Sequence, residues 1–132
     1  MPTKNMWGDL PTMEDTKTPL LIMREQANIL KQATRGVLHA SISTTPLTLG
    51  KMRHSFYLVA PLLNDYRHLL FSVEHGIDPY PVKFSAPRMK NLARCKREKD
   101  FELILTELLR DASTRKAIAS LIANSEAIKQ VA

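Results

Sequence analysis

The sequence predicts an α+β fold, in which an antiparallel meander of three to four strands carries helices on one face. Two changes of hydrophobic period support this prediction. Residues 19–35 repeat apolar side chains every three to four positions, residues 37–84 alternate them, and residues 101–129 return to the helical period. Consecutive strands with short connections pair as antiparallel neighbours. One N-terminal helix and two C-terminal helices are therefore expected to cover the sheet.

The first helix is predicted to span residues 19–35. Thr18 is a favourable N-cap, and Pro19 suits the first helical position, where its missing N–H costs nothing. Gly36 suits the left-handed residue that follows a helix end.

Three alternating segments predict three strands. They cover residues 37–43, 51–60 and 66–75. In the third strand, Leu69, Phe71 and Val73 are predicted to share one face, with His75 on it and His68 opposite. The other sheet face is expected to be partly wet. Its candidate residues are His39, Ser41, Ser43, Arg53, Ser55, Tyr57 and Arg67.

A fourth candidate strand covers residues 80–84. Pro79 and Pro81 cannot donate ladder hydrogen bonds, so this segment is predicted to be an edge strand or no strand.

Two helices are predicted after residue 99. In the first, Phe101, Ile104 and Leu105 begin an apolar stripe, and Asp100 is the expected N-cap. Ser113 is the expected N-cap of the second.

The chain of 132 residues predicts a single domain, residues 18–132, preceded by a flexible tail, residues 1–17. Trp7 and Leu10 are available to attach this tail to the domain.

No membrane-spanning run of apolar residues is present, and a single cysteine excludes an internal disulfide. A cytoplasmic protein is therefore expected.

The net charge of +6 is concentrated in one segment, residues 83–99, which is predicted to be a basic connector. Seven of the 19 basic residues and one of the 13 acidic residues fall in it, so the remaining twelve of each balance. We predict that this segment binds an anionic partner. The candidate residues are Lys83, Arg88, Lys90, Arg94, Lys96, Arg97 and Lys99. A solvated linker or an exposed amphipathic helix is the simpler alternative.

Catalytic signatures are absent from the sequence, so the protein is predicted not to be an enzyme and to need no cofactor. Phosphate-binding glycine loops and nucleophile motifs do not occur. Cys95 lies among cations that would lower its pKa, but no oriented base accompanies it in the sequence. The four histidines, His39, His54, His68 and His75, lie in the strand region without the spacing of metal ligands.

These observations predict a small binding or adaptor protein, monomeric or homodimeric, whose partner is another protein, possibly an acidic one. A nucleic-acid binder that uses residues 83–99 without sequence specificity is the first alternative. Those contacts would be to phosphates, because residues 85–99 contain no aromatic side chain for base stacking. A small enzyme or metal protein using the strand histidines is the second alternative.

Overall fold

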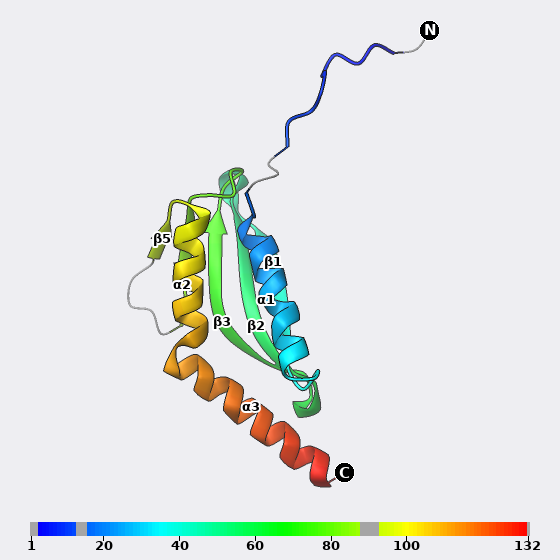
Figure 1. Cartoon of the computed structure of the whole chain (residues 1–132), viewed down its shortest axis with the longest axis vertical. Coiled ribbons are helices and arrows are strands. Elements are labelled where there is room, and N and C mark those ends of the chain that lie inside the picture. The colour runs from blue at the N-terminus through cyan, green and yellow to red at the C-terminus, as the bar shows by residue number, and fades with distance from the viewer. Residues whose placement is uncertain (1–2, 13–15, 88–92, 132) are drawn as a thin grey trace.

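The computed structural model describes residues 3–12, 16–87 and 93–131 and confirms the α+β fold (Figure 1). In chain order, the elements are α1 (Pro19–Ala33), β1 (His39–Pro46), β2 (Met52–Ala60), β3 (Tyr66–His75), β4 (Val82–Ser85), β5 (Ala93–Cys95), α2 (Glu98–Arg110) and α3 (Ala112–Val131). The strands lie across the sheet in the order in which they occur along the chain, and all pairs are antiparallel. The sheet is therefore a meander, with five strands instead of the predicted three to four.

The helices lie on one face of the sheet, as predicted. In Figure 1, α1 and α2 run in front of the strands, and α3 crosses the lower end of the sheet. α1 packs on β1, and α3 contacts β2 and the short 3-10 turn Pro61–Leu63 that follows it. Within the described residues, none of the helices has the length and apolar content needed to cross a membrane. The second face of the sheet, which we call the outer face, carries no described helix.

The ends of α1 follow the predicted capping chemistry. The Thr18 side chain accepts a hydrogen bond from the Leu21 N–H at 3.2 Å. The helix ends at Ala33, two residues before the predicted end. Gly36 has a φ of +80°, and its N–H donates to the Lys31 carbonyl at 2.8 Å. A left-handed glycine thus closes the last turn, as the sequence indicated.

A bulge in β3 changes which side chains face the helices. Phe56 pairs with Phe71, but Tyr57 pairs with Leu69, so Leu70 is the extra residue. Because one inserted residue reverses the alternation beyond it, Leu69 lies on the opposite face from Phe71. The prediction that these two side chains share a face is therefore wrong.

β4 is an internal strand and not the predicted edge strand. It pairs with β3 on one side and with β5 on the other. Val82 and Phe84 are fully buried, whereas Pro79 and Pro81 precede the strand and remove no ladder hydrogen bond.

All four phenylalanines form one continuous row through the core. Adjacent rings of Phe56, Phe71, Phe84 and Phe101 have centroid separations of 5.1, 5.3 and 5.0 Å, and all four side chains are buried. These separations suit offset or tilted aromatic pairs. The row joins β2, β3 and β4 to α2 and fixes the helix against the sheet.

The two C-terminal helices begin earlier than predicted. α2 starts at Glu98 with Arg97 in the N-cap position, so Asp100 lies within the first turn. α3 starts at Ala112, and the Asp111 carboxylate accepts a hydrogen bond from the Ser113 N–H at 3.0 Å. Asp111 is therefore the residue that caps this N-terminus, where a negative charge is favourable, and the assignments of Asp100 and Ser113 are wrong.

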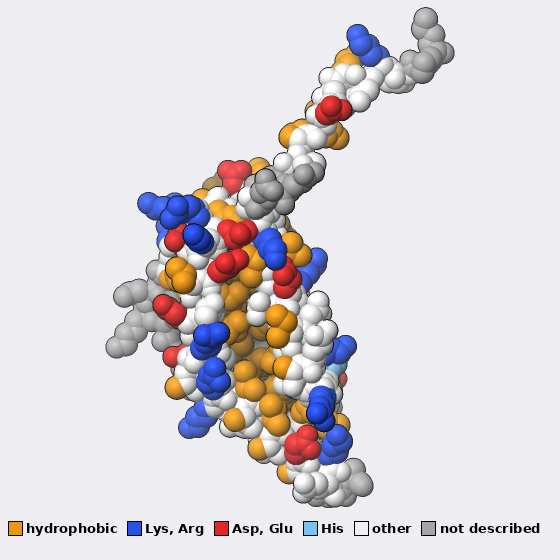
Figure 2. Space-filling model, in the orientation of Figure 1, with side chains coloured by type: hydrophobic (Ala, Val, Ile, Leu, Met, Phe, Trp, Pro, Cys, Tyr) orange, Lys and Arg blue, Asp and Glu red, His pale blue; other side chains and the backbone are white. Residues whose placement is uncertain are grey.

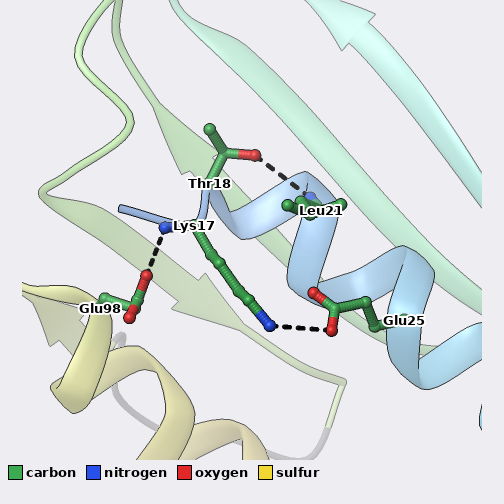
Figure 3. A network of polar contacts seen from close by, with 5 residues as sticks. All are labelled: Lys17, Thr18, Leu21, Glu25 and Glu98. Carbon is green, nitrogen blue, oxygen red and sulfur yellow. Dashed lines mark hydrogen bonds and ion pairs between the residues drawn. The ribbon is translucent and has the colours of Figure 1, made fainter. Parts of the chain in front are cut away.

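Lys17, which precedes the α1 N-cap, contacts α1, α2 and the segment before β4, and Figure 3 shows its contacts with Glu25 and Glu98. The Lys17 backbone N–H donates to the Glu98 carboxylate at the start of α2, and Lys17 Nζ pairs with Glu25 of α1 at 3.0 Å. The Tyr80 hydroxyl donates to the Lys17 carbonyl at 2.8 Å. We call these four residues the Lys17 cluster.

The described part of the tail, residues 3–12, extends away from the domain (Figure 1). Trp7 is 82% exposed and Leu10 is 67% exposed. The suggestion that these two side chains attach the tail to its own domain is therefore wrong for this structure.

Candidate functional site

The predicted basic segment does not form one element. Its described part contains most of β4, all of β5 and the first two residues of α2. Five of the predicted binding residues are described and exposed: Lys83, Arg94, Lys96, Arg97 and Lys99. Arg88 and Lys90 lie outside the described residues. An amphipathic helix through the segment is excluded at residues 93–95, because these residues are a strand.

The strand register carries a row of charged side chains across the outer face. Arg53, Glu74, Lys83 and Arg94 are consecutive cross-strand neighbours on β2, β3, β4 and β5. Arg53 donates to the Glu74 carboxylate through Nε at 2.9 Å and through Nη2 at 2.6 Å. Lys83 and Arg94 stand opposite each other, and neither forms an ion pair with a described residue. We call these four residues the charged row.

The other described residues of the outer face are mostly polar, with Val59 and Leu69 as apolar exceptions. The Ser55 and Ser72 hydroxyls are 2.9 Å apart on neighbouring strands. The Arg67 guanidinium lies 4.1 Å from the centre of the Tyr57 ring. This cation–π contact covers the ring, so Tyr57 offers a partner less open aromatic surface.

A pair of histidines lies on the face that carries the helices. His54 Nε2 and His75 Nε2 are 2.8 Å apart, and their ring centroids are separated by 4.9 Å. His54 is only 2% exposed. The register explains the contact: His54 pairs with Val73, so His75 is its diagonal neighbour on the same face.

The partners of this pair fix where the protons are when both rings are neutral. The Gly76 carbonyl, 2.7 Å from His75 Nδ1, can only accept, so Nδ1 carries the proton and His75 Nε2 accepts from His54 Nε2–H. His54 Nδ1 then accepts from the Thr44 hydroxyl at 2.8 Å. Burial lowers the pKa of His54, and the positive charges of protonated His75 and Arg24 lower it further.

The Thr44 hydroxyl, the His54 ring and the His75 ring are hydrogen-bonded in that order. A hydroxyl beside an imidazole that is held by a third group is the arrangement of an activated nucleophile. Catalysis also requires a substrate cavity beside the nucleophile and donors for the developing negative charge. His54 is almost fully buried, and Thr44, His54 and His75 line neither the cavity between β3, α2 and α3 nor the depression between α1 and α2. The pair is therefore better explained as a buried structural contact.

The other two histidines do not join this pair into a metal site. His39 lies on the outer face opposite Val59, and His68 pairs with Leu58 beyond the β3 bulge. The bulge places His68 on the same side of the sheet as His54 and His75, so the prediction that it faces away from His75 is wrong. Among the described residues, no group of three histidine, cysteine or acidic side chains is placed to hold a metal ion.

Cys95 is a core residue and not an exposed thiol. Its side chain is fully buried, on the face of β5 opposite that of Arg94. Burial raises the pKa of the thiol, and the negative charge of Asp100 raises it further. The prediction that neighbouring cations lower this pKa is therefore wrong, because alternation along β5 directs the thiol inwards.

A cavity of about 530 Å³ lies between β3, α2 and α3. Leu70, Ile104 and Leu108 give it an apolar part, and Glu107 and Lys116 are among its polar residues. The Thr114 hydroxyl, which also lines it, donates to the Leu108 carbonyl at 2.8 Å. This hydroxyl therefore supports the α2–α3 junction and is already satisfied without a ligand.

Sequence reasoning missed the charged row and the histidine pair, although it named most of their members. Both depend on strand register, which hydrophobic alternation does not supply. Comparisons of the chain with protein-family models, with curated proteins and with solved structures find no match.

Proposed function

We propose that this chain is a non-enzymatic binding protein that holds an acidic partner protein against the outer face of its sheet. One observation carries the proposal. Lys83 and Arg94 are like charges directly opposite each other on neighbouring strands, and neither has an ion-pair partner among the described residues. Like-charge pairs at such positions are destabilising. A carboxylate supplied by a partner would relieve this repulsion.

The surroundings of this pair supply further positive charge. Among the residues that the structure describes on the outer face, the charged side chains are Arg53, Arg67, Lys83 and Arg94 against Glu74 alone. Lys96, Arg97 and Lys99 follow β5 immediately and are exposed. Such a surface accelerates encounter with a negatively charged partner and disfavours cationic ones.

An acidic protein fits this face better than a nucleic acid. Glu74, in the middle of the charged row, would repel a phosphate backbone that followed the row. Tyr57 is the only phenylalanine, tyrosine or tryptophan on the described outer face, and Arg67 already covers its ring, so bases have little surface on which to stack. A single partner carboxylate can instead contact Arg94, at the end of the charged row, without following the row past Glu74.

Phosphate contact is the second candidate, favoured by the succession of exposed cations Arg94, Lys96, Arg97 and Lys99. It would be independent of base sequence.

Fluorescence anisotropy with labelled probes tests both candidates. The probes are a polyglutamate peptide, a duplex DNA, a duplex RNA and a single strand, each at low and moderate salt. The test variant is Lys83→Gln/Arg94→Gln, and the matched control is Lys31→Gln/Lys129→Gln, which removes two cations from exposed positions on α1 and α3.

The expected result is salt-dependent binding of the acidic peptide, weakened at least about tenfold in the test variant and unchanged in the control, which corresponds to about 1.4 kcal/mol. Binding of the nucleic acids but not of the peptide would support the second candidate. No binding of any probe by the wild-type chain at low salt would refute both.

A further inference from the structure

The bulge in β3 opens a strand edge inside the sheet. β4 pairs with β3 only between Ser72 and Glu74, although β3 begins at Tyr66. The extra residue, Leu70, lies two positions before Ser72, and a bulge bends its strand and can end the pairing. On the β4 side, Pro87 has no N–H with which to continue the ladder. The first half of β3 therefore has no β4 residue beside it.

Residues 66–69 form a regular strand with one open side, which we call the free edge. On one side, they pair in unbroken register with residues 57–60 of β2. On the other side, no backbone hydrogen bond joins them to another described residue. A row of unpaired N–H and C=O groups is a template for an added strand.

The cavity between β3, α2 and α3 lies beside the free edge. Its walls include His68 and Leu69, which belong to that edge. They also include Ala86 and Pro87, at which the chain leaves β4. The cavity therefore lies where a longer β4 would have continued. Its volume of about 530 Å³ is within the roughly 300–1,000 Å³ of ligand sites.

The helices supply an apolar wall to the same cavity. Ile104 and Leu108 of α2 and Ala117 of α3 line it, and each is half-buried, so part of each side chain remains open. The exposed residues Glu107 and Lys116 carry charges of opposite sign, so the lining does not select a strongly charged ligand. A ligand that suits this site has extended backbone on one side and an apolar side chain on the other.

Two other surfaces offer only half of this combination. Figure 2 shows hydrophobic side chains gathered between α1 and α2 and along α3. The strip between α1 and α2 lies over β2 and β3, where these strands pair with each other and leave no backbone open (Figure 1). β1 is an edge strand of the sheet, but none of its residues lines the cavity.

We propose that a partner protein adds an extended segment to the free edge and seats an apolar side chain of that segment in the cavity. Backbone pairing supplies affinity in this mode of recognition, and the pocket supplies specificity. Successive side chains of a strand point to opposite faces, so the segment is expected to have apolar residues at alternate positions. The site is separate from the charged row and binds through backbone, so the proposal stands independently of the proposed function.

Selection from a displayed library of random peptides of about eight residues, twice the length of the free edge, tests the proposal. The library is applied in parallel to the wild-type protein and to two variants. Ser120→Arg obstructs the cavity from an exposed position on α3. The matched control, Asn124→Arg, adds the same side chain one turn further along, outside the cavity lining. Arginine favours a helix more than serine or asparagine does, so both variants are expected to fold.

The expected result is enrichment, on the wild-type protein and on Asn124→Arg, of peptides with alternating apolar residues. No enrichment on the wild-type protein would overturn the proposal, and so would equal enrichment on Ser120→Arg. The most enriched peptide is then titrated by fluorescence anisotropy beside the same peptide with every backbone nitrogen methylated. Methylation keeps the side chains and removes the N–H donors, so it is expected to weaken binding at least about tenfold. Unchanged affinity would overturn the backbone pairing.

Hydrogen exchange of individual backbone amides, measured by NMR, locates the added strand. The amides of residues 66–69 that point away from β2 are expected to exchange rapidly in the free protein and slowly with the enriched peptide bound. A bound peptide that leaves these amides unprotected would overturn the assigned edge. Protection that rises with protein concentration in the absence of peptide would mean that a second copy of the chain pairs there, and would overturn the assigned partner.

Discussion

The buried pair His54–His75 predicts that the protein loses stability as the solution becomes mildly acidic. In the neutral state, every ring nitrogen of the pair has a partner. One added proton can be accommodated, because Thr44 can accept a hydrogen bond from His54 Nδ1–H when His54 Nε2 accepts one from His75. A second proton places two N–H donors against each other at 2.8 Å.

The direction of the effect follows from the lowered pKa of His54. In the unfolded chain, this group titrates near its ordinary value of about 6.5. Below that pH, the unfolded state binds more protons than the folded state, so the free energy of unfolding decreases as the pH falls. The stability that depends on a neutral His54 is fully present above the pKa of His54 in the unfolded chain. It is lost progressively as the pH falls to the lowered pKa of His54 in the folded protein.

The separation of the rings sets the size of the effect. Two positive charges 4.9 Å apart repel by about 3 kcal/mol at an effective dielectric constant of about 20. This figure is an upper limit, because His75 is only partly buried and solvent screens its charge. For a domain with a total stability of about 5–15 kcal/mol, the loss is easily measurable.

Urea denaturation followed by circular dichroism gives the free energy of unfolding at about pH 8 and at about pH 5, and the difference between the two values is the predicted loss of stability. Tryptophan fluorescence is unsuitable here, because Trp7 lies in the exposed tail. His75→Gln removes one of the two charges and should reduce the difference between the two pH values, whereas His39→Gln, on the outer face, should preserve it. Equal wild-type stability at both pH values, or an undiminished loss in His75→Gln, would refute the reasoning.

Three further outcomes follow from individual contacts. Phe84→Ala, which opens the centre of the phenylalanine row, should cost about 3–5 kcal/mol of unfolding free energy in urea denaturation, and a cost below about 1 kcal/mol would contradict the core described for it. Cys95 should resist a thiol reagent in the native protein and react once the chain is unfolded, because burial raises the pKa of its thiol; native reactivity equal to that of free cysteine would be inconsistent with its position. Arg53→Gln should change thermal stability by less than about 1 kcal/mol, because its pair with Glu74 is partly exposed; a larger loss would show that the charged row stabilises the sheet.

Local chemistry predicted the elements that have strong local signals. Thr18 and Gly36 marked the ends of α1, and alternation located β2 at the observed residues within one position. β5 was missed because three residues are too short to show a period, and the basic residues around it pointed to a connector.

Features that depend on pairing could not be predicted. His54 and His75 were each placed on an apolar face of their own strand, but contact between them depends on a register that alternation alone leaves open. The extra residue at Leu70 leaves no mark in the sequence, and it moved Leu69 and His68 to faces opposite those expected. The lowered pKa predicted for Cys95 was wrong for a similar reason, because the charges next to it in sequence lie on the other side of the strand or beyond its end.

The sequential strand order has a consequence for how the chain folds. Each strand pairs with the one immediately before it, so the sheet can grow hairpin by hairpin with little loop-closure entropy at each step, and rapid folding is expected. The Lys17 cluster is different, because Lys17 and Glu98 are 81 positions apart. We expect contacts of that range to form after the barrier has been crossed, and interactions formed late mainly slow unfolding. We therefore expect the cluster to prolong the lifetime of the native state without setting the speed at which that state is reached.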